Sequence, residues 1–264
     1  HAEVVRINET SDGRIDSVVY RDVDGNEQTL AGDEFISSMP VKDLVDSIAD
    51  GNQSTQPVPA KMKQIADGLP YRDFVTVGFL VDHLNLKNET DIPTLGNPPI
   101  VPDCWIYVQD TSVKVGRIQV FNNWSPYLVK DVDNKVWIGL EYFCNEGDDF
   151  WNMSDAECID FAANELVKMG IIASKNDIQD AHRERVKKAY PAYFDTWYQM
   201  DDLVKWLDSF ENLYCVGRNG QHRYNNMDHS MVTAFEAVGN IKTGRADKKN
   251  VWNVNTDKEY HEEK

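Results

Sequence analysis

The segment LYCVGRNGQHRYNNMDHSMVTAFEAVG, residues 213–239, contains the clearest structural signal in this chain. It opens with an apolar strand, which is followed by a glycine turn at Gly217 and by a polar loop. The loop leads to Asp228, which we expect to cap a helix that begins near His229. A strand, a glycine turn and a helix N-terminus direct backbone N–H groups at one spot, and Arg218 adds a planar, bidentate phosphate contact. The pattern predicts an anion cradle, and it is equally compatible with a plain turn between a strand and a helix.

The complete pattern is more specific than its parts. Gly217 and Arg218 are followed by Tyr224 and then by Asn-Met-Asp at residues 226–228, ahead of a helix. This arrangement resembles the C-terminal flavin-binding segment of the flavoprotein group that comprises FAD-dependent amine oxidases, protoporphyrinogen oxidases and UDP-galactopyranose mutases. The mutases are the most similar, although they have an aspartate at the position of Asn226. The asparagine keeps the hydrogen-bonding shape and removes a charge.

The resemblance implies FAD as the cofactor. In this group the Gly-Arg pair lies beside the FAD pyrophosphate, and the loop before the helix lies beside the isoalloxazine ring. A β unit at residues 2–36, followed by a strand that ends in Ser-Met-Pro, is similar to the element that follows the first half of the group's FAD domain. A valine in the first strand of that element contacts the adenine through its backbone. The cofactor-binding residues implied by the resemblance are Val4, Gly217, Arg218, Asn226, Met227 and Asp228.

The order of the predicted elements indicates an α+β fold. The N-terminal β unit is followed by a polar, proline-containing loop, a series of strands separated by turn residues, and amphipathic helices. The resemblance implies an antiparallel-sheet substrate domain with helices, inserted between pieces of an FAD-binding α/β domain. We expect residues 1–48 and 201–245 to belong to the FAD-binding domain and residues 49–200 to form the substrate domain. Residues 246–264 are expected to be a loose tail.

Local signals place individual elements within this order. The apolar, β-branched run at residues 73–81 predicts a strand, and Ser154 with Glu157 forms a capping box that predicts a helix to about Met169. Two hairpin turns are predicted within residues 2–36. No regular element is assigned to residues 177–191.

Tyr190, Tyr224 and Arg117 are the candidate catalytic residues. The Tyr-Pro-Ala-Tyr sequence at residues 190–193 resembles a Tyr-Pro segment that lies near the flavin in the group. The ring of Tyr224 is suited to stack on flavin or substrate while its hydroxyl reaches a phosphate or a carbonyl. Arg117 lies in a predicted alternating strand, where it would point into the substrate cleft and hold a diphosphate or a propionate. A solvent-facing arginine on that strand is the alternative.

Histidine and cysteine patterns indicate no metal site. His222 and His229 flank Tyr224, where a histidine near a flavin could carry protons at neutral pH. No third ligand stands beside them at metal-binding spacing. The four cysteines include no Cys-x-x-Cys pair, and we expect buried free thiols.

The bulk composition limits the partners. The chain has 264 residues, of which 41% are hydrophobic, enough for one or two domains with a substantial core. Its formal net charge of −17 disfavours nucleic acid and anionic membrane surfaces as partners. No apolar run approaches the roughly 20 residues of a membrane span, and no signal peptide is visible. We therefore expect a cytoplasmic protein that acts on a small-molecule substrate, with an anionic one favoured by Arg117.

No G-x-G-x-x-G follows a strand, and the sequence opens within a strand-like run without a methionine. We expect the N-terminal, dinucleotide-binding part of a larger protein to be absent, and that part to be the partner of this chain. This chain alone is then expected to be inactive and to bind FAD weakly or not at all. Three functions fit: a portion of an FAD-dependent oxidoreductase, which we favour, a UDP-galactopyranose mutase-like isomerase, or a non-enzymatic nucleotide-binding or interaction module.

Overall fold

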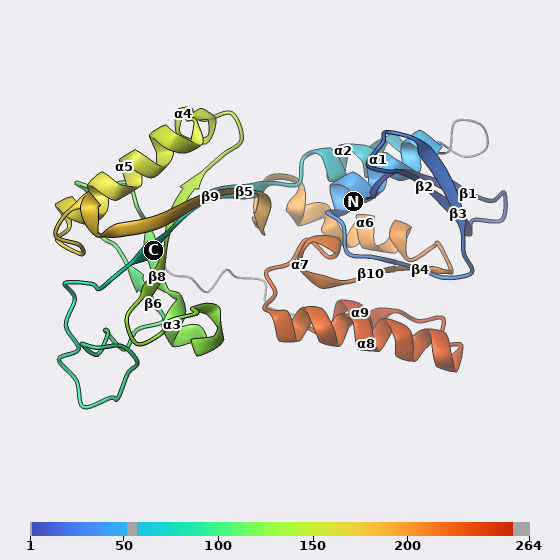
Figure 1. Ribbon diagram of the computed structural model, residues 1–264. Coiled ribbons are helices and arrows are strands. Elements are labelled where there is room, and N and C mark those ends of the chain that lie inside the picture. Colours follow the sequence, from blue (N-terminus) through green and yellow to red (C-terminus); the bar gives the residue numbers. More distant parts are fainter. Residues whose placement is uncertain (1, 52–56, 256–264) are drawn as a thin grey trace. The chain divides into compact units, whose positions relative to one another are not determined.

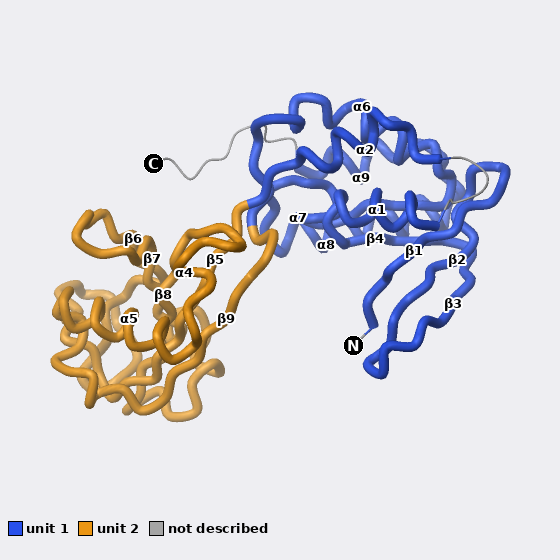
Figure 2. The backbone as a smooth tube through the Cα atoms, turned by 90° about the horizontal axis from the view of Figure 1, so that it is seen from above, with its two compact units in different colours: residues 1–71, 190–264 blue, residues 72–189 orange. Residues whose placement is uncertain are grey.

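The computed structural model describes residues 2–51 and 57–255 (Figure 1). Helices and strands are mixed, as the predicted α+β fold requires. The chain divides into two compact units (Figure 2): unit 1 consists of residues 1–71 and 190–264, and unit 2 of residues 72–189. Unit 2 is shorter at both ends than the substrate domain expected at residues 49–200. The difference arises because Ile65, Ala66 and Met200 are buried in the core of unit 1.

A three-stranded antiparallel sheet opens unit 1. The strands β1 (Glu3–Glu9), β2 (Ile15–Arg21) and β3 (Glu27–Ala31) lie side by side in sequence order. Gly13 and Gly25 have φ angles of +81° and +83° in the two turns, a conformation that glycine adopts without a steric penalty. Both predicted hairpins are therefore confirmed.

A parallel strand pair forms the second sheet of unit 1. β4 (Phe35–Ser37) pairs in parallel with β10 (Leu213–Cys215). The buried side chain of Asn212 fixes this pair. Its Nδ2 donates to the carbonyl oxygens of Ile15 and Asp33 at 2.9 and 2.8 Å, and its Oδ1 accepts the N–H of Ile15 at 2.9 Å. One amide thus joins β2, the entrance to β4 and the entrance to β10.

Helices cover the core of unit 1 and continue the chain after β10. The first helices of the unit bury Leu44, Ile48 and Ile65 in one cluster with Leu203 and Leu207 from the helix that precedes β10. Figure 1 shows the last helices of the chain following β10. The bounds are α1 Val41–Gly51, α2 Ala60–Asp67, η3 Asp195–Gln199, α6 Met200–Leu207, α7 Gly217–Gly220, α8 Met227–Thr243 and α9 Lys249–Trp252.

Unit 2 is built on a five-stranded sheet with the strand order β6-β7-β8-β5-β9. One face of the sheet buries apolar side chains such as Val77, Ile118 and Leu140 in a cluster with Ala162 and Leu166 of α5. The bounds are β5 Tyr71–Val81, β6 Trp105–Tyr107, β7 Arg117–Val120, α3 Phe121–Trp124, η1 Pro126–Leu128, β8 Val136–Cys144, α4 Asp149–Asn152, α5 Asp155–Lys168, η2 Lys175–Asp177 and β9 Ile178–Pro191.

The start of α5 confirms the predicted capping box. Ser154 Oγ accepts the backbone N–H of Glu157 at 3.3 Å, and the Glu157 carboxylate accepts the backbone N–H of Ser154 at 2.9 Å. The strand β9 was not predicted. It is an edge strand of the sheet, and six of its 14 residues are charged, so its sequence lacks the apolar alternation that identifies strands.

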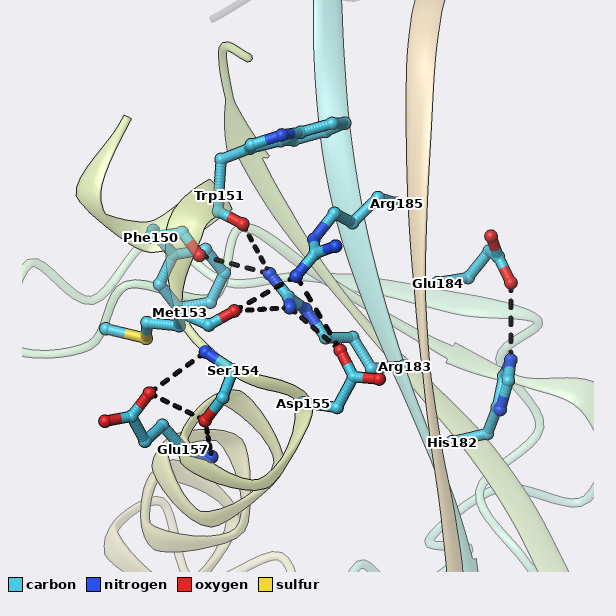
Figure 3. Close-up of polar contacts among 10 residues, drawn as sticks. All are labelled: Phe150, Trp151, Met153, Ser154, Asp155, Glu157, His182, Arg183, Glu184 and Arg185. Atoms are coloured by element: carbon cyan, nitrogen blue, oxygen red, sulfur yellow. Dashed lines mark hydrogen bonds and ion pairs between the residues drawn. The ribbon is translucent and has the colours of Figure 1, made fainter. Parts of the chain in front are cut away.

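Arg183 connects β9 to the loop that opens α5 (Figure 3). Its buried guanidinium donates through Nη1 to the carbonyl oxygen of Met153 at 2.7 Å and to Asp155 Oδ1 at 3.0 Å. Through Nη2 it donates to the carbonyl oxygens of Trp151 and Phe150 at 2.8 and 3.3 Å. The last carbonyl groups of α4 have no partners within the helix, so this cation replaces the missing donors.

The C-terminal part of the chain departs from the prediction in two places. α8 begins at Met227 with Asn226 as its N-cap residue, so the expectation that Asp228 caps the helix is wrong. Residues 246–255 are not a loose tail, because they include α9 and bury Val251 and Trp252. The rest of the predicted tail lies outside the described residues.

We expect Asn212→Ala to destabilise unit 1 by roughly 3 kcal/mol, because three buried backbone groups lose their partner. Chemical denaturation followed by tryptophan fluorescence measures this cost. Asn253→Ala, at an exposed asparagine of the same unit, is the matched control. Equal stabilities of the two variants would contradict the role of Asn212.

Candidate functional site

The loop that follows β10 is held against the end of β4. Gly217 has a φ of +74°, which turns the chain out of the strand into α7. A Cβ atom on Gly220 would lie 2.7 Å from the carbonyl oxygen of Ser37, so only glycine permits this close approach. The backbone N–H of Val216 donates to the same carbonyl oxygen at 2.9 Å. The predicted strand and glycine turn are present, and they place Arg218 at the carboxyl ends of two parallel strands.

Arg218, Tyr190 and Tyr224 form one cluster. The Arg218 guanidinium carbon lies 4.7 Å from the ring centroid of Tyr224 and 5.3 Å from that of Tyr190. The two rings are stacked, with centroids 6.2 Å apart and an interplanar angle of 19°. Arg218 Nε donates to the carbonyl oxygen of Asn225 at 2.9 Å. All three side chains are half-buried, and the structure brings Tyr190 together with two residues of the motif that begins at Gly217.

Tyr193 is a further member of this cluster that the sequence did not single out. Its hydroxyl accepts the backbone N–H of Tyr224 at 2.6 Å. Its ring stacks on Trp197 with centroids 4.7 Å apart. The sequence signal was the second aromatic residue of the Tyr-Pro-Ala-Tyr segment, which belongs to the same turn as Tyr190.

The remaining candidates for cofactor binding lie at two places in unit 1. Asn226, Met227 and Asp228 form the exposed start of α8. The Asn226 N–H donates to Nδ1 of His229 at 3.3 Å. Val4 is half-buried in β1, which belongs to a different sheet from β10.

His222 is buried inside the loop. Its Nε2 lies 3.1 Å from the carbonyl oxygen of Ala192, and its ring contacts Tyr71 edge-on at a centroid distance of 4.6 Å. Burial lowers the pKa of His222 to about 4, and the bond to Ala192 opposes this shift only in part. His222 is therefore neutral at pH 7 in this conformation.

Several buried polar atoms around the loop have no hydrogen-bond partner among the described residues. Folded proteins pair such atoms with ordered water or with a bound polar group. The region contains five of the nine such atoms in the described part of the chain: Ser37 Oγ, Asn219 Oδ1, Gln221 Oε1, His222 Nδ1 and Asn225 Nδ2. Their concentration at the carboxyl ends of β4 and β10 marks a region suited to polar ligands.

Arg117 lies in unit 2, on the face of the sheet opposite to α5. Its Nε and Nη2 donate to Glu141 Oε2 at 2.9 and 2.6 Å. The two residues face each other across β7 and β8, and they are 5% and 2% exposed. Gln119 Nε2 donates to the other oxygen of Glu141. The structure thus places a buried, neutralised ion pair where the sequence predicted a cationic side chain in a cleft.

Aromatic rings surround this ion pair. The Arg117 guanidinium carbon lies 5.4 Å from the ring centroid of Trp105, 5.8 Å from that of Tyr107 and 6.0 Å from that of Phe143. Trp105 and Tyr107 are exposed and line a cavity of about 650 Å³ at β6. Sequence reasoning missed Glu141. Its signal was a single carboxylate within the otherwise apolar strand at residues 136–144.

The cysteines are free thiols, as predicted. Cys144, Cys158 and Cys215 are buried, whereas Cys104 is half-buried. Burial raises the pKa of Cys215 to about 12, so its thiol is unreactive at neutral pH. Residues 2–51 and 57–255 contain no group of three or more His, Cys, Asp or Glu side chains arranged to hold a metal ion.

No helix in the described part of the chain combines the length and apolar character needed to cross a bilayer.

No protein-family model and no curated protein matches this chain. Its fold matches that of a reduced UDP-galactopyranose mutase with a TM-score of 0.68 and 19% identity, covering 98% of this chain and 51% of the mutase. A protein from Exiguobacterium sp. 255-15 assigned as a protoporphyrinogen oxidase matches with a TM-score of 0.53 and 11% identity, over 83% of this chain and 42% of its own. The chain spans about half the length of these structures. The chain therefore shares its fold with the matched halves of these two proteins.

We expect His222 to make folding sensitive to acid. The group binds a proton more weakly in the folded than in the unfolded state, so stability is lost as the pH falls from 6.5 towards 4. The expected loss is about 2 kcal/mol by pH 5. His222→Asn removes the titrating group, and asparagine tolerates the φ of +46° at this position. Urea denaturation at pH 7.5 and pH 5 should show a smaller loss of unfolding free energy for the variant. Equal losses in the variant and the parent protein would show that His222 does not cause the acid sensitivity.

We expect Glu141→Gln to destabilise unit 2 by about 3 to 5 kcal/mol, because it leaves a buried guanidinium without its counter-charge. The double variant Arg117→Met, Glu141→Leu should recover most of this loss, since no buried charge then remains unpaired. Guanidinium denaturation of the single and double variants measures the difference. A double variant less stable than Glu141→Gln would contradict this prediction, because it would show that the ion pair contributes stability that apolar side chains cannot replace.

Proposed function

We propose that this chain is part of an FAD-dependent enzyme of the amine oxidase and protoporphyrinogen oxidase-like oxidoreductases. In this proposal unit 2 is the substrate domain, and the segment from β10 into α8 contacts the flavin. The observation that supports it most directly is the cluster of Arg218, Tyr190 and Tyr224 at the carboxyl ends of two parallel strands. Ligands of α/β sheets bind at this edge. The matches to flavoprotein folds agree with it.

The residues present fit a flavin dinucleotide. Five buried polar atoms beside the cluster require polar partners, and the phosphates, the ribityl hydroxyls and the waters around them would meet that need. Arg218 and Gly217 would lie beside the pyrophosphate, Asn226, Met227 and Asp228 beside the ring system, and Val4 beside the adenine. The bound flavin supplies hydride or electron transfer at its ring, and the protein supplies position, electrostatics and exclusion of water.

The side chains of this chain perform those supporting tasks. The stacked rings of Tyr190 and Tyr224 present an apolar wall with hydroxyl groups at its edge, which excludes water and orients a ring or a phosphate. Arg218 beside the two rings provides a planar cation. In unit 2, Arg117 would hold an anionic substrate group beneath Trp105 and Tyr107, with Glu141 balancing its charge before the substrate binds.

We also propose that the dinucleotide-binding part of the same fold is the partner of this chain. Parallel sheets are normally covered on both faces and have more than two strands, and β4 pairs only with β10 among the described strands. One face of α8 exposes Met227 (82%), Met231, Phe235 (70%) and Val238 at helical spacing. A further βαβ unit would extend the two-stranded sheet and cover the apolar face of α8.

A UDP-galactopyranose mutase-like activity is the second candidate. It is supported by a TM-score of 0.68 over nearly the whole chain, higher than the 0.53 of the oxidase-like protein. Asn226 counts against this candidate, because the mutases have an aspartate at that position. Conversion of UDP-galactopyranose only after dithionite reduction, without net consumption of reductant, would identify the mutase. Net substrate oxidation would identify the oxidoreductase.

The visible absorption spectrum of the protein expressed from its complete reading frame tests the proposal. A flavin double band in the purified protein is the expected result. A folded, colourless protein that stays colourless after addition of FAD would overturn it and favour a non-enzymatic interaction module.

We expect Arg218→Ala to weaken FAD binding by roughly 10- to 100-fold in that protein, because a charge-assisted hydrogen bond is lost. Arg245→Ala is the matched control, since Arg245 is exposed beyond α8 and pairs with Asp247 at 3.6 Å. FAD titration after dialysis against potassium bromide measures both affinities. Equal affinities of the two variants would exclude Arg218 from the cofactor site.

A further inference from the structure

The segment around α9 contacts the loop that carries Tyr224. Gln221 Nε2 donates to the carbonyl oxygen of Val251 at 2.9 Å and to that of Cys215 at 3.2 Å. Arg223 Nη1 donates to the carbonyl oxygen of Trp252 at 2.8 Å. The loop is therefore bonded on one side to β10 and on the other side to the end of the described chain.

Asn255 makes the most direct of these contacts. Its Nδ2 donates to the carbonyl oxygen of Tyr224 at 2.8 Å and to Asn225 Oδ1 at 3.2 Å. Its own carbonyl oxygen accepts from Arg223 Nη1. The carbonyl oxygen of Asn225 in turn accepts from Arg218 Nε at 2.9 Å. A continuous hydrogen-bonded path thus leads from Asn255 to both Tyr224 and Arg218.

The segment that provides Asn255 has its own attachment to unit 1. Lys248 Nζ is buried and donates to the carbonyl oxygens of Phe210 and Leu213 at 2.6 and 2.7 Å. Trp252 Nε1 donates to Asp208 Oδ1 at 2.9 Å. These contacts are made to the end of α6 and the start of β10. Residues 248–255 therefore form a fixed support on which the loop rests.

The loop needs such a support. Residues 221–226 belong to no helix or strand, and His222 has a φ of +46°, an unfavourable conformation for a residue with a side chain. A backbone of this kind persists only where surrounding contacts determine it. The bonds from Asn255 and from Arg223 are made at the two residues that follow this strained position.

We propose that residues 248–255 are a strap that holds the loop at residues 221–226, and that Asn255 is a positioning residue for Tyr224 and Arg218. This rests on the proposed function only in taking those two side chains as ligand contacts. The strap acts through the backbone of Tyr224 and the side chain of Asn225, so it fixes where the Tyr224 ring and the Arg218 guanidinium lie without touching the ligand itself.

Amide hydrogen exchange measured by NMR tests the strap directly. The N–H groups of Tyr224 and Asn226 are suitable reporters, because they belong to the loop and donate to Tyr193 Oη and His229 Nδ1. We expect Asn255→Ala to accelerate their exchange by about tenfold, since two hydrogen bonds are lost. Asn253→Ala, an exposed neighbour in the same segment, should leave it unchanged.

A variant of nearly the same shape distinguishes a loosened loop from a general folding defect. Asn255→Asp preserves the volume and replaces the Nδ2 donor by an acceptor that faces two oxygen atoms, so it should loosen the loop at least as much as alanine. Asn253→Asp is its control for the added charge. Unchanged exchange in both Asn255 variants would overturn the strap. Faster exchange throughout unit 1 would overturn it as well, because Asn255 would then stabilise the unit in general.

A flavin readout separates the strap from the proposed function. In the full-length flavoprotein we expect Asn255→Ala, but not Asn253→Ala, to shift the flavin absorption bands. A loosened loop together with an unchanged flavin spectrum would support the strap and contradict the placement of flavin at Tyr224. An unchanged loop would overturn the strap whatever the flavin spectrum shows.

Discussion

The parallel pairing of β4 with β10 is the constraint on which unit 1 depends. It joins residues 35–37 to residues 213–215, and the connection between them includes all of unit 2. Parallel strands end at the same edge of a sheet, so Ser37 and Gly217 meet there and the loop with Arg218 leaves from that edge. Asn212, immediately before β10, stabilises this long-range pairing, because its buried side chain satisfies three backbone groups of two other segments, at Ile15 and Asp33. The candidate site therefore follows from one long-range contact.

Buried and half-buried cations bind the ends of several helices and strands in this acidic chain. Arg183, Arg223 and Lys248 donate to backbone carbonyl oxygens at the ends of helices or strands. Burial lowers the pKa of Lys248, a shift that Asp208 opposes in part, and it lowers the pKa of Arg223, a shift that Tyr193 and Asp201 oppose in part. Arg117 differs, because its partner is the carboxylate of Glu141 and aromatic rings enclose both. A net negative charge thus coexists with cations at fixed internal positions.

The sequence predicted a good part of the candidate site, because its motifs are local. Tyr190, Arg218 and Tyr224 were selected from two short segments, and they lie together. The partner of Arg117 was not predicted, since Glu141 comes from another strand and meets it only through the register of β7 and β8. The support from Asn255 was missed for a similar reason. A polar, charged C-terminal segment has no apolar periodicity, although it buries Val251 and Trp252.

Local chemistry determined the hairpins, the capping box of α5, the strands with apolar alternation and the glycine turn after β10, because each depends on residues a few positions apart. The cap of α8 shows the limit of such reasoning, since Asn226 and Asp228 are both good capping residues and only the backbone path selects between them. Which distant segments contact one another was decided by the tertiary structure. The parallel sheet, the edge strand β9, the Arg117–Glu141 pair and the support under Tyr224 each require residues distant in sequence to meet. Their energies depend on burial, which exists only once the chain has folded.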